Sequence, residues 1–131
     1  MKLVLDTNIV VSAFINPNGL PSQIIGIILN RKAEFIFNTA ILSEYENVMI
    51  RPKFSKLIKP DNIRKFIDLI RIIGTSFNPL KSKIKLPDES DRIFYDTAKQ
   101  SGSALISGNL KHFPKDPFIM SPSDLLKLIN I

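Results

Sequence analysis

Short apolar runs alternate along the chain with longer segments in which apolar residues recur every three or four positions. The short runs predict buried β-strands, and the longer spacing predicts amphipathic helices. Strands are expected at 2–6, 34–37, 75–77, 104–106 and 118–119. Helices are expected over 9–15, from 21, from 39 to about 50, over 54–58, over 61–73, over 91–100 and from about 123. The segment 78–89, interrupted by two prolines, is expected to be a loop.

Polar residues at the ends of these segments suggest how the helices begin and end. Asn38 or Thr39 could cap the third helix, and Asp61 could cap the helix that follows the 54–58 segment. Asp88 or Ser90 could cap the helix over 91–100, and Gly102 is placed to end it. Ser121 or Ser123 could cap the final helix.

The alternation of strands and helices predicts an α/β fold with a mainly parallel sheet of four to five strands. The length of 131 residues fits one domain, 1–131, and no repeat or low-complexity tract divides it. In sheets of this kind, functional sites lie at the carboxyl ends of the strands. Asp6 follows the first strand and the Ser107-Gly-Asn109 loop follows another, so a site is expected between them.

Several carboxylates are placed where they could take part in such a site. Asp6 follows a buried strand, where an unpaired carboxylate is costly, although it could also serve as the cap of the next helix. Glu44 and Glu46 border opposite sides of one apolar helical stripe, and periodicity does not choose between them. Asp91 and Asp96 are about 140° apart around the axis of the predicted helix, so the two side chains are not expected to point into the same metal site.

Charge is concentrated in the middle of the chain. The net charge is +6, yet residues 51–85 contain ten Lys/Arg and two Asp, a net +8. A basic stretch of this kind is typical of a surface that binds a polyanion such as nucleic acid, and it is also typical of a solvated, lysine-rich face. No apolar run approaches the roughly 20 residues of a membrane span, and no secretory signal is evident, so a cytoplasmic protein is expected.

Other common chemistries find little support. The chain has no cysteine, which excludes disulfides, zinc–thiolate sites and thiol nucleophiles. His112 is the one histidine and is better explained as a hydrogen-bonding loop residue. Ser12, Ser43 and Ser107 lack an evident base, and the glycines form no phosphate-binding loop. A receiver-like phosphoacceptor domain would need adjacent acids after the first strand, where only Asp6 stands.

Four segments together resemble the motifs of the PIN domain family, in particular its VapC-like toxin ribonucleases. They are Leu3-Val-Leu-Asp-Thr-Asn-Ile-Val-Val-Ser12, Ala40-Ile-Leu-Ser-Glu-Tyr45, Pro87-Asp-Glu-Ser-Asp-Arg-Ile-Phe-Tyr-Asp-Thr-Ala98 and Ala104-Leu-Ile-Ser-Gly-Asn-Leu-Lys-His-Phe-Pro114. The resemblance implies a three-layer α/β/α fold. It also implies a site in which Asp6, Glu44 and Asp91 bind metal and Asn109 occupies the fourth polar position. This assignment favours Glu44 over Glu46.

The resemblance further implies a Mg²⁺- or Mn²⁺-dependent endoribonuclease that hydrolyses RNA phosphodiester bonds. Asn8 and Asp96 are expected as supporting residues. A cognate antitoxin, RNA and a second copy of the chain are the expected partners. Many members of the family have Asp where this chain has Asn109, and an amide contributes no negative charge. The alternative is therefore a catalytically weak or inactive PIN module that binds RNA or a protein partner.

Overall fold

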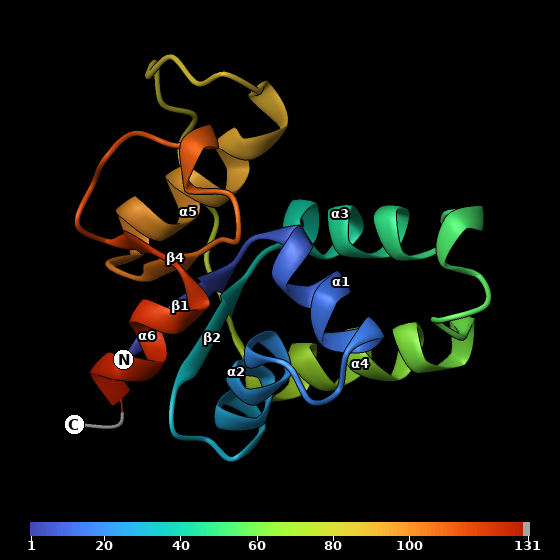
Figure 1. Ribbon diagram of the computed structural model, residues 1–131. Coiled ribbons are helices and arrows are strands. Elements are labelled where there is room, and N and C mark those ends of the chain that lie inside the picture. The colour runs from blue at the N-terminus through green and yellow to red at the C-terminus, as the bar shows by residue number, and fades with distance from the viewer. Residues whose placement is uncertain (130–131) are drawn as a thin grey trace.

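The computed structural model describes residues 1–129, and its centre is a five-stranded, fully parallel sheet (Figure 1). The strand order is β3-β2-β1-β4-β5. The strands are β1 (Lys2–Leu5), β2 (Glu34–Phe37), β3 (Thr75–Ser76), β4 (Ala104–Ile106) and β5 (Ile119–Met120). The register pairs Leu3 with both Phe35 of β2 and Ala104 of β4. The expected α/β class and parallel sheet are confirmed, with β5 one residue later than predicted.

Six α-helices surround this sheet in a three-layer arrangement. They are α1 (Thr7–Ile15), α2 (Leu20–Leu29), α3 (Thr39–Met49), α4 (Pro60–Ile73), α5 (Arg92–Ser101) and α6 (Pro122–Ile129). Helix α5 packs against β1, β2 and β4, while α1, α2 and α4 lie on the other side of the strands in Figure 1. Across residues 1–129, none of the helices has the length and apolar content needed to cross a membrane.

Three single turns of 3₁₀ helix complete the structure, and one of them corrects a prediction. They are η1 (Pro52–Phe54), η2 (Glu89–Asp91) and η3 (Leu110–His112). The helix expected over 54–58 is wrong: the chain forms η1 and then turns, with Ile58 buried. A segment this short gains too few hydrogen bonds to offset helix nucleation, so burial of one apolar side chain decides its shape.

The predicted helix caps are confirmed in part. Gly102 ends α5 with φ 71°, a left-handed conformation that suits glycine. The Ser121 hydroxyl accepts a hydrogen bond from the Asp124 N–H at the start of α6. Asp61 is not a cap, because α4 begins one residue earlier, at Pro60, which favours the first helical turn. Asp88 caps η2 rather than α5.

The apolar residues of the central strand β1 are fully buried, and the end of this strand fixes the position of α3. Leu3, Val4 and Leu5 have no exposed surface. The buried Tyr45 hydroxyl of α3 donates a hydrogen bond to the Leu5 carbonyl at 2.6 Å. Since Leu5 is the last residue of β1, this bond holds α3 beside the point where the chain reaches Asp6.

Asn38 links three elements beneath the carboxyl edge of the sheet. Its Oδ1 accepts a hydrogen bond from Ile41 N at 2.9 Å and so caps α3. Its Nδ2 donates to the Phe77 carbonyl at 3.1 Å and to the Thr97 hydroxyl of α5 at 2.9 Å. Asn38, rather than Thr39, is therefore the cap, and it also holds α5 against α3.

Candidate functional site

A pocket of about 430 Å³ lies at the carboxyl edge of the sheet, where Asp6 follows β1 and Asn109 follows β4. All four predicted catalytic positions line it, together with the predicted supporting residue Asn8. The predicted residues in its wall are Asp6, Asn8, Glu44, Asp91 and Asn109. The fold thus brings together residues from four separate sequence segments, as expected for a parallel sheet.

Asp6 is held rigidly at the base of this pocket. It is 7% exposed and caps α1, with its Oδ1 accepting a hydrogen bond from Thr7 N at 2.8 Å. Its Oδ2 accepts a hydrogen bond from the Ser107 hydroxyl at 2.7 Å. Burial raises the pKa of Asp6, while these two bonds oppose the rise. Asp6 is therefore both the helix cap and a pocket residue, and the two interpretations are compatible.

Asp91 faces the same pocket from the end of η2. It is 9% exposed, and its pKa is raised to about 6, first by burial and then by the negative charges of Asp6, Asp88 and, more weakly, Glu44. Its Oδ2 has no hydrogen-bond partner among residues 1–129. The Nδ1 atom of His112 lies 3.5 Å from this oxygen, which is longer than a good hydrogen bond.

The side chains of Glu44 and Glu46 line different pockets. Glu44 is half-buried in the pocket wall, beside Val48. Glu46 is exposed and lines a different groove, with residues of α4. The helical wheel places the two on opposite flanks of α3, and the packing of α3 turns only the Glu44 flank toward Asp6.

The loop after β4 is attached to the pocket by polar contacts. The Ser107 hydroxyl accepts a hydrogen bond from Asn109 N at 3.0 Å, and Asn8 Oδ1 accepts one from Gly108 N at 3.3 Å. The Asn109 amide nitrogen lies 3.0 Å from His112 Nε2. Asn8 therefore supports the loop, and His112 is the hydrogen-bonding loop residue that the sequence suggested.

Asp96 is the predicted residue that the structure does not bring to the pocket. It is 3% exposed and lines a separate hollow with Lys81 and Arg92, and its Oδ2 accepts a hydrogen bond from Ser82 N at 2.9 Å. The helical phase of α5 directs it toward the 78–88 segment, away from Asp91. Its expected supporting role in the site is a prediction that this placement does not favour.

The sequence did not mark Asp88, Arg51 or Lys53 as residues of this pocket, or Ser107 as a residue that orients Asp6. Asp88 adds a further carboxylate to the pocket, Arg51 and Lys53 add positive charge, and the Ser107 hydroxyl positions Asp6. A polar residue directly after a buried strand was a usable signal for Ser107. Nothing in the sequence distinguishes Arg51 and Lys53 from the other basic residues of the 51–85 stretch.

The donor chemistry of the pocket fits a hard divalent cation. Two buried oxygens in its wall, Thr7 Oγ1 and Asp91 Oδ2, have no hydrogen-bond partner within the described residues. The negative charge of Asp6 helps to raise the pKa of Asp91, and a bound cation would lower that pKa again. Within residues 1–129, however, no three acidic or histidine side chains stand close enough together to form a ready-made metal cluster.

Comparisons with known proteins agree with this architecture. An uncharacterised protein of Methanocaldococcus jannaschii is 32% identical over 110 residues, covering 83% of this chain and 71% of the relative. The crystal structure of VapBC2 from Rickettsia felis, bound to a DNA fragment from its promoter, matches with a TM-score of 0.59. That match covers 92% of this chain and 97% of the other, at 16% identity, and shows a shared fold. The model of the PIN domain family matches residues 2–111, so this chain belongs to the PIN domain family.

Proposed function

We propose that this protein is a metal-dependent endoribonuclease. The observation that carries the proposal is the pairing of two buried carboxylates, Asp6 and Asp91, across one pocket, with Asp91 Oδ2 lacking a hydrogen bond within residues 1–129. Burial raises the pKa of both carboxyls, and the charge of Asp6 raises that of Asp91 further. A cation bound between two such groups stabilises both as anions. Membership of the PIN domain family also supports a nuclease function.

Asp6, Glu44 and Asp91 are the residues that would hold Mg²⁺ or Mn²⁺, with oxygen ligands of the type these ions prefer. When bound, such an ion lowers the pKa of a water molecule and stabilises the charge that builds on the phosphate oxygens. Ser107 and Thr7 N hold the Asp6 carboxylate in one orientation. Asn109 and His112 form the rim on which a scissile phosphate or a water would be positioned.

Arg51 and Lys53 bring positive charge to the same pocket as the aspartates. Lys53 Nζ lies 5.0 Å from the centre of the Phe54 ring. A polyanion could place one phosphate near the carboxylates and another near these cations. Contacts of this kind give binding that weakens as salt rises. Single-stranded RNA is the proposed substrate.

The decisive experiment is cleavage of a single-stranded RNA with Mg²⁺ or Mn²⁺, repeated with EDTA. The wild type should cleave with either metal and stop with EDTA. Asp6→Asn should abolish cleavage and should keep the far-ultraviolet circular dichroism spectrum of the wild type. Cleavage by Asp6→Asn at the wild-type rate would refute the proposed site.

A second candidate is a PIN module that binds RNA or a protein without cleaving it. Asn109 favours it, because an amide leaves the site one charge poorer than an aspartate would. The lack of a ready-made metal cluster among residues 1–129 favours it as well. Titration with Mn²⁺ separates the two: RNA binding without Mn²⁺ binding at millimolar concentration would favour the module.

The proposed biological context is a toxin–antitoxin pair acting in the cytoplasm. The chain would be the toxin, would form a homodimer, and would be inhibited by an antitoxin encoded beside it. The fold shared with the VapBC2 structure supports this context. A small antitoxin-like open reading frame next to the gene, whose product copurifies with this protein, is the expected finding.

A further inference from the structure

Three side chains of α5 bind the backbone of the preceding loop at regular intervals. Arg92, Asp96 and Gln100 are four residues apart, so they share one face of the helix. We call them the clamp residues. Their hydrogen bonds go to the backbone of alternate residues, Leu80, Ser82 and Ile84. The loop predicted over 78–89 is therefore an extended segment that runs antiparallel to α5.

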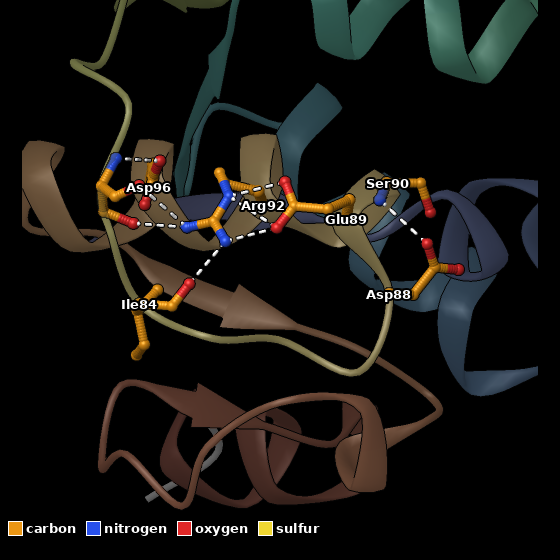
Figure 2. Close-up of polar contacts among 7 residues, drawn as sticks. Ile84, Asp88, Glu89, Ser90, Arg92 and Asp96 are labelled. Carbon is orange, nitrogen blue, oxygen red and sulfur yellow. Dashed lines mark hydrogen bonds and ion pairs between the residues drawn. The ribbon is translucent and has the colours of Figure 1, made fainter.

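The individual bonds leave little freedom to this segment. Gln100 binds both backbone groups of Leu80, accepting from N at 2.8 Å and donating to O at 2.6 Å. Asp96 accepts from Ser82 N at 2.9 Å, and Arg92 donates to Ser82 O at 3.0 Å. Figure 2 shows Arg92 reaching the Ile84 carbonyl while it also pairs with Glu89.

The clamp determines which side chains face solvent. Extended backbone sends successive side chains to opposite sides. Ser82 and Ile84 turn partly inward, while Lys81, Lys83 and Lys85 are exposed. We call these three the lysine row. At about 3.3 Å per residue, neighbouring lysines of the row are roughly 6.6 Å apart along the chain, and the row spans about 13 Å.

The charge of the row is not cancelled by the clamp. Glu89 lies near Lys81, yet its carboxylate pairs with Arg92. Among residues 1–129, no carboxylate comes within ion-pair distance of Lys81, Lys83 or Lys85. The bonds of Arg92 to Glu89 and to the backbone therefore order the segment, while three ammonium groups remain available to an anionic partner.

The row leads to the pocket described above. The segment continues from Lys85 through Pro87 to Asp88, which lines the pocket and accepts a hydrogen bond from Ser90 N (Figure 2). Lys85 is therefore the end of the row nearest to Asp91, and Lys81 is the farthest. A chain molecule lying in the pocket can continue outward along the row.

We propose that the lysine row binds consecutive phosphates of a single-stranded RNA outside the catalytic pocket. This inference rests on the proposed function, which supplies RNA as the polyanion. A single line of cations at a regular spacing fits one extended phosphate backbone better than the two strands of a duplex. Lysine is a compact point charge that contacts phosphate without reading sequence, so the row should bind RNAs of different sequence equally well.

The test uses the Asp6→Asn protein in EDTA, so that binding is measured without cleavage. Fluorescence anisotropy of a labelled 12-nucleotide RNA gives Kd from 50 to 300 mM salt. The row variant carries Lys81→Gln, Lys83→Gln and Lys85→Gln. The control variant carries Arg64→Gln, Lys65→Gln and Arg71→Gln on α4, which removes the same charge from the other side of the sheet (Figure 1).

The row variant should bind roughly 10- to 100-fold more weakly at 0.1 M salt, and the slope of log K against log salt should fall by about 2. The control variant should stay within about threefold of its parent. Equal losses in both variants, or an unchanged slope in the row variant, would overturn the proposal.

A second measurement separates the row from the catalytic assignment. In the active protein, the row variant should raise KM and leave kcat within about twofold, because the row lies outside the pocket. If the wild type cleaves no RNA, the proposed function fails. The anisotropy measurement would still show whether the lysine row binds RNA. Gln100→Ala, which frees Leu80 without altering charge, should weaken binding about threefold, and unchanged binding would refute the role of the clamp.

Discussion

The Ser107 hydroxyl donates a 2.7 Å hydrogen bond to Asp6 Oδ2, joining residues that are 101 positions apart in the chain. Ser107 has no exposed surface, and the same hydroxyl accepts from Asn109 N. One side chain thus fixes both the first predicted metal ligand and the loop that carries the fourth predicted position.

Ser107→Ala should reduce nuclease activity by about 10- to 100-fold, the usual effect of losing a group that orients a metal ligand. The loss of the bond should also raise the pKa of Asp6, because this hydrogen bond lowers it. The acidic limb of the pH–rate profile should therefore move to higher pH. Ser103→Ala, in a buried serine at the other end of β4, is the control and should leave the profile unchanged.

The stability of the metal-free protein should depend on the charge of Asp91. Its pKa is about 6 in the folded protein, against an ordinary value of 3.8 in the unfolded chain, so the folded state binds the proton more tightly. Stability should therefore be greatest below about pH 4, fall as pH rises to about 6, and then level off. Urea denaturation in EDTA between pH 4 and 7.5 measures this trend.

Asp91→Asn should flatten that dependence, since an amide does not titrate. Asp124→Asn, at an exposed position in α6, should retain the wild-type trend. A wild-type protein that gains stability between pH 4 and 6 would contradict the assignment of Asp91 as a carboxyl with a raised pKa.

Glu44→Gln should lower cleavage by at least about 10-fold and weaken Mn²⁺ binding, because it removes one of three predicted ligand charges. Glu46→Gln makes the same chemical change two residues away, in a different groove, and should stay within about twofold of the wild type. Isothermal titration with Mn²⁺ and a cleavage assay check both variants. A larger effect from Glu46→Gln would reverse the choice between the two.

Asn38→Ala should destabilise the fold by roughly 2–4 kcal/mol, because it removes a helix cap and two further hydrogen bonds from a buried site. Thr39→Ala changes the exposed neighbour that sequence reasoning ranked equally, and should cost under about 0.5 kcal/mol. Urea unfolding of both variants, followed by circular dichroism, decides whether Asn38 alone caps α3.

Much of this organisation could be predicted because it depends on local patterns. Apolar runs located the strands, and because the carboxyl ends of parallel strands lie at one edge of a sheet, Asp6 and Asn109 were expected at the same edge. Glu44 could not be separated from Glu46 by periodicity, since both flank the same stripe, and the family resemblance supplied the choice. The placement of α3, set by the bond from Tyr45 to Leu5, turns Glu44 into the pocket.

The 78–88 segment shows where structure prediction from local sequence patterns fails. Its two prolines and alternating lysines indicate an irregular, solvated loop. Its order comes from side chains 8 to 20 positions further along the chain, on one face of α5. The same bonds explain why Asp96 lies outside the pocket that Asp6 lines: its Oδ2 accepts a hydrogen bond from the backbone of Ser82.

The central place of β1 also determines when the pocket can form during synthesis. β1 leaves the ribosome about a hundred residues before its partner β4 and Ser107. Pairing between strands so far apart in the sequence is slow, because the entropy of closing the loop is lost before the contacts between the strands form. A nascent chain that ends before residue 107 therefore lacks the orienting bond to Asp6, and the carboxylates of the pocket remain unassembled while translation continues.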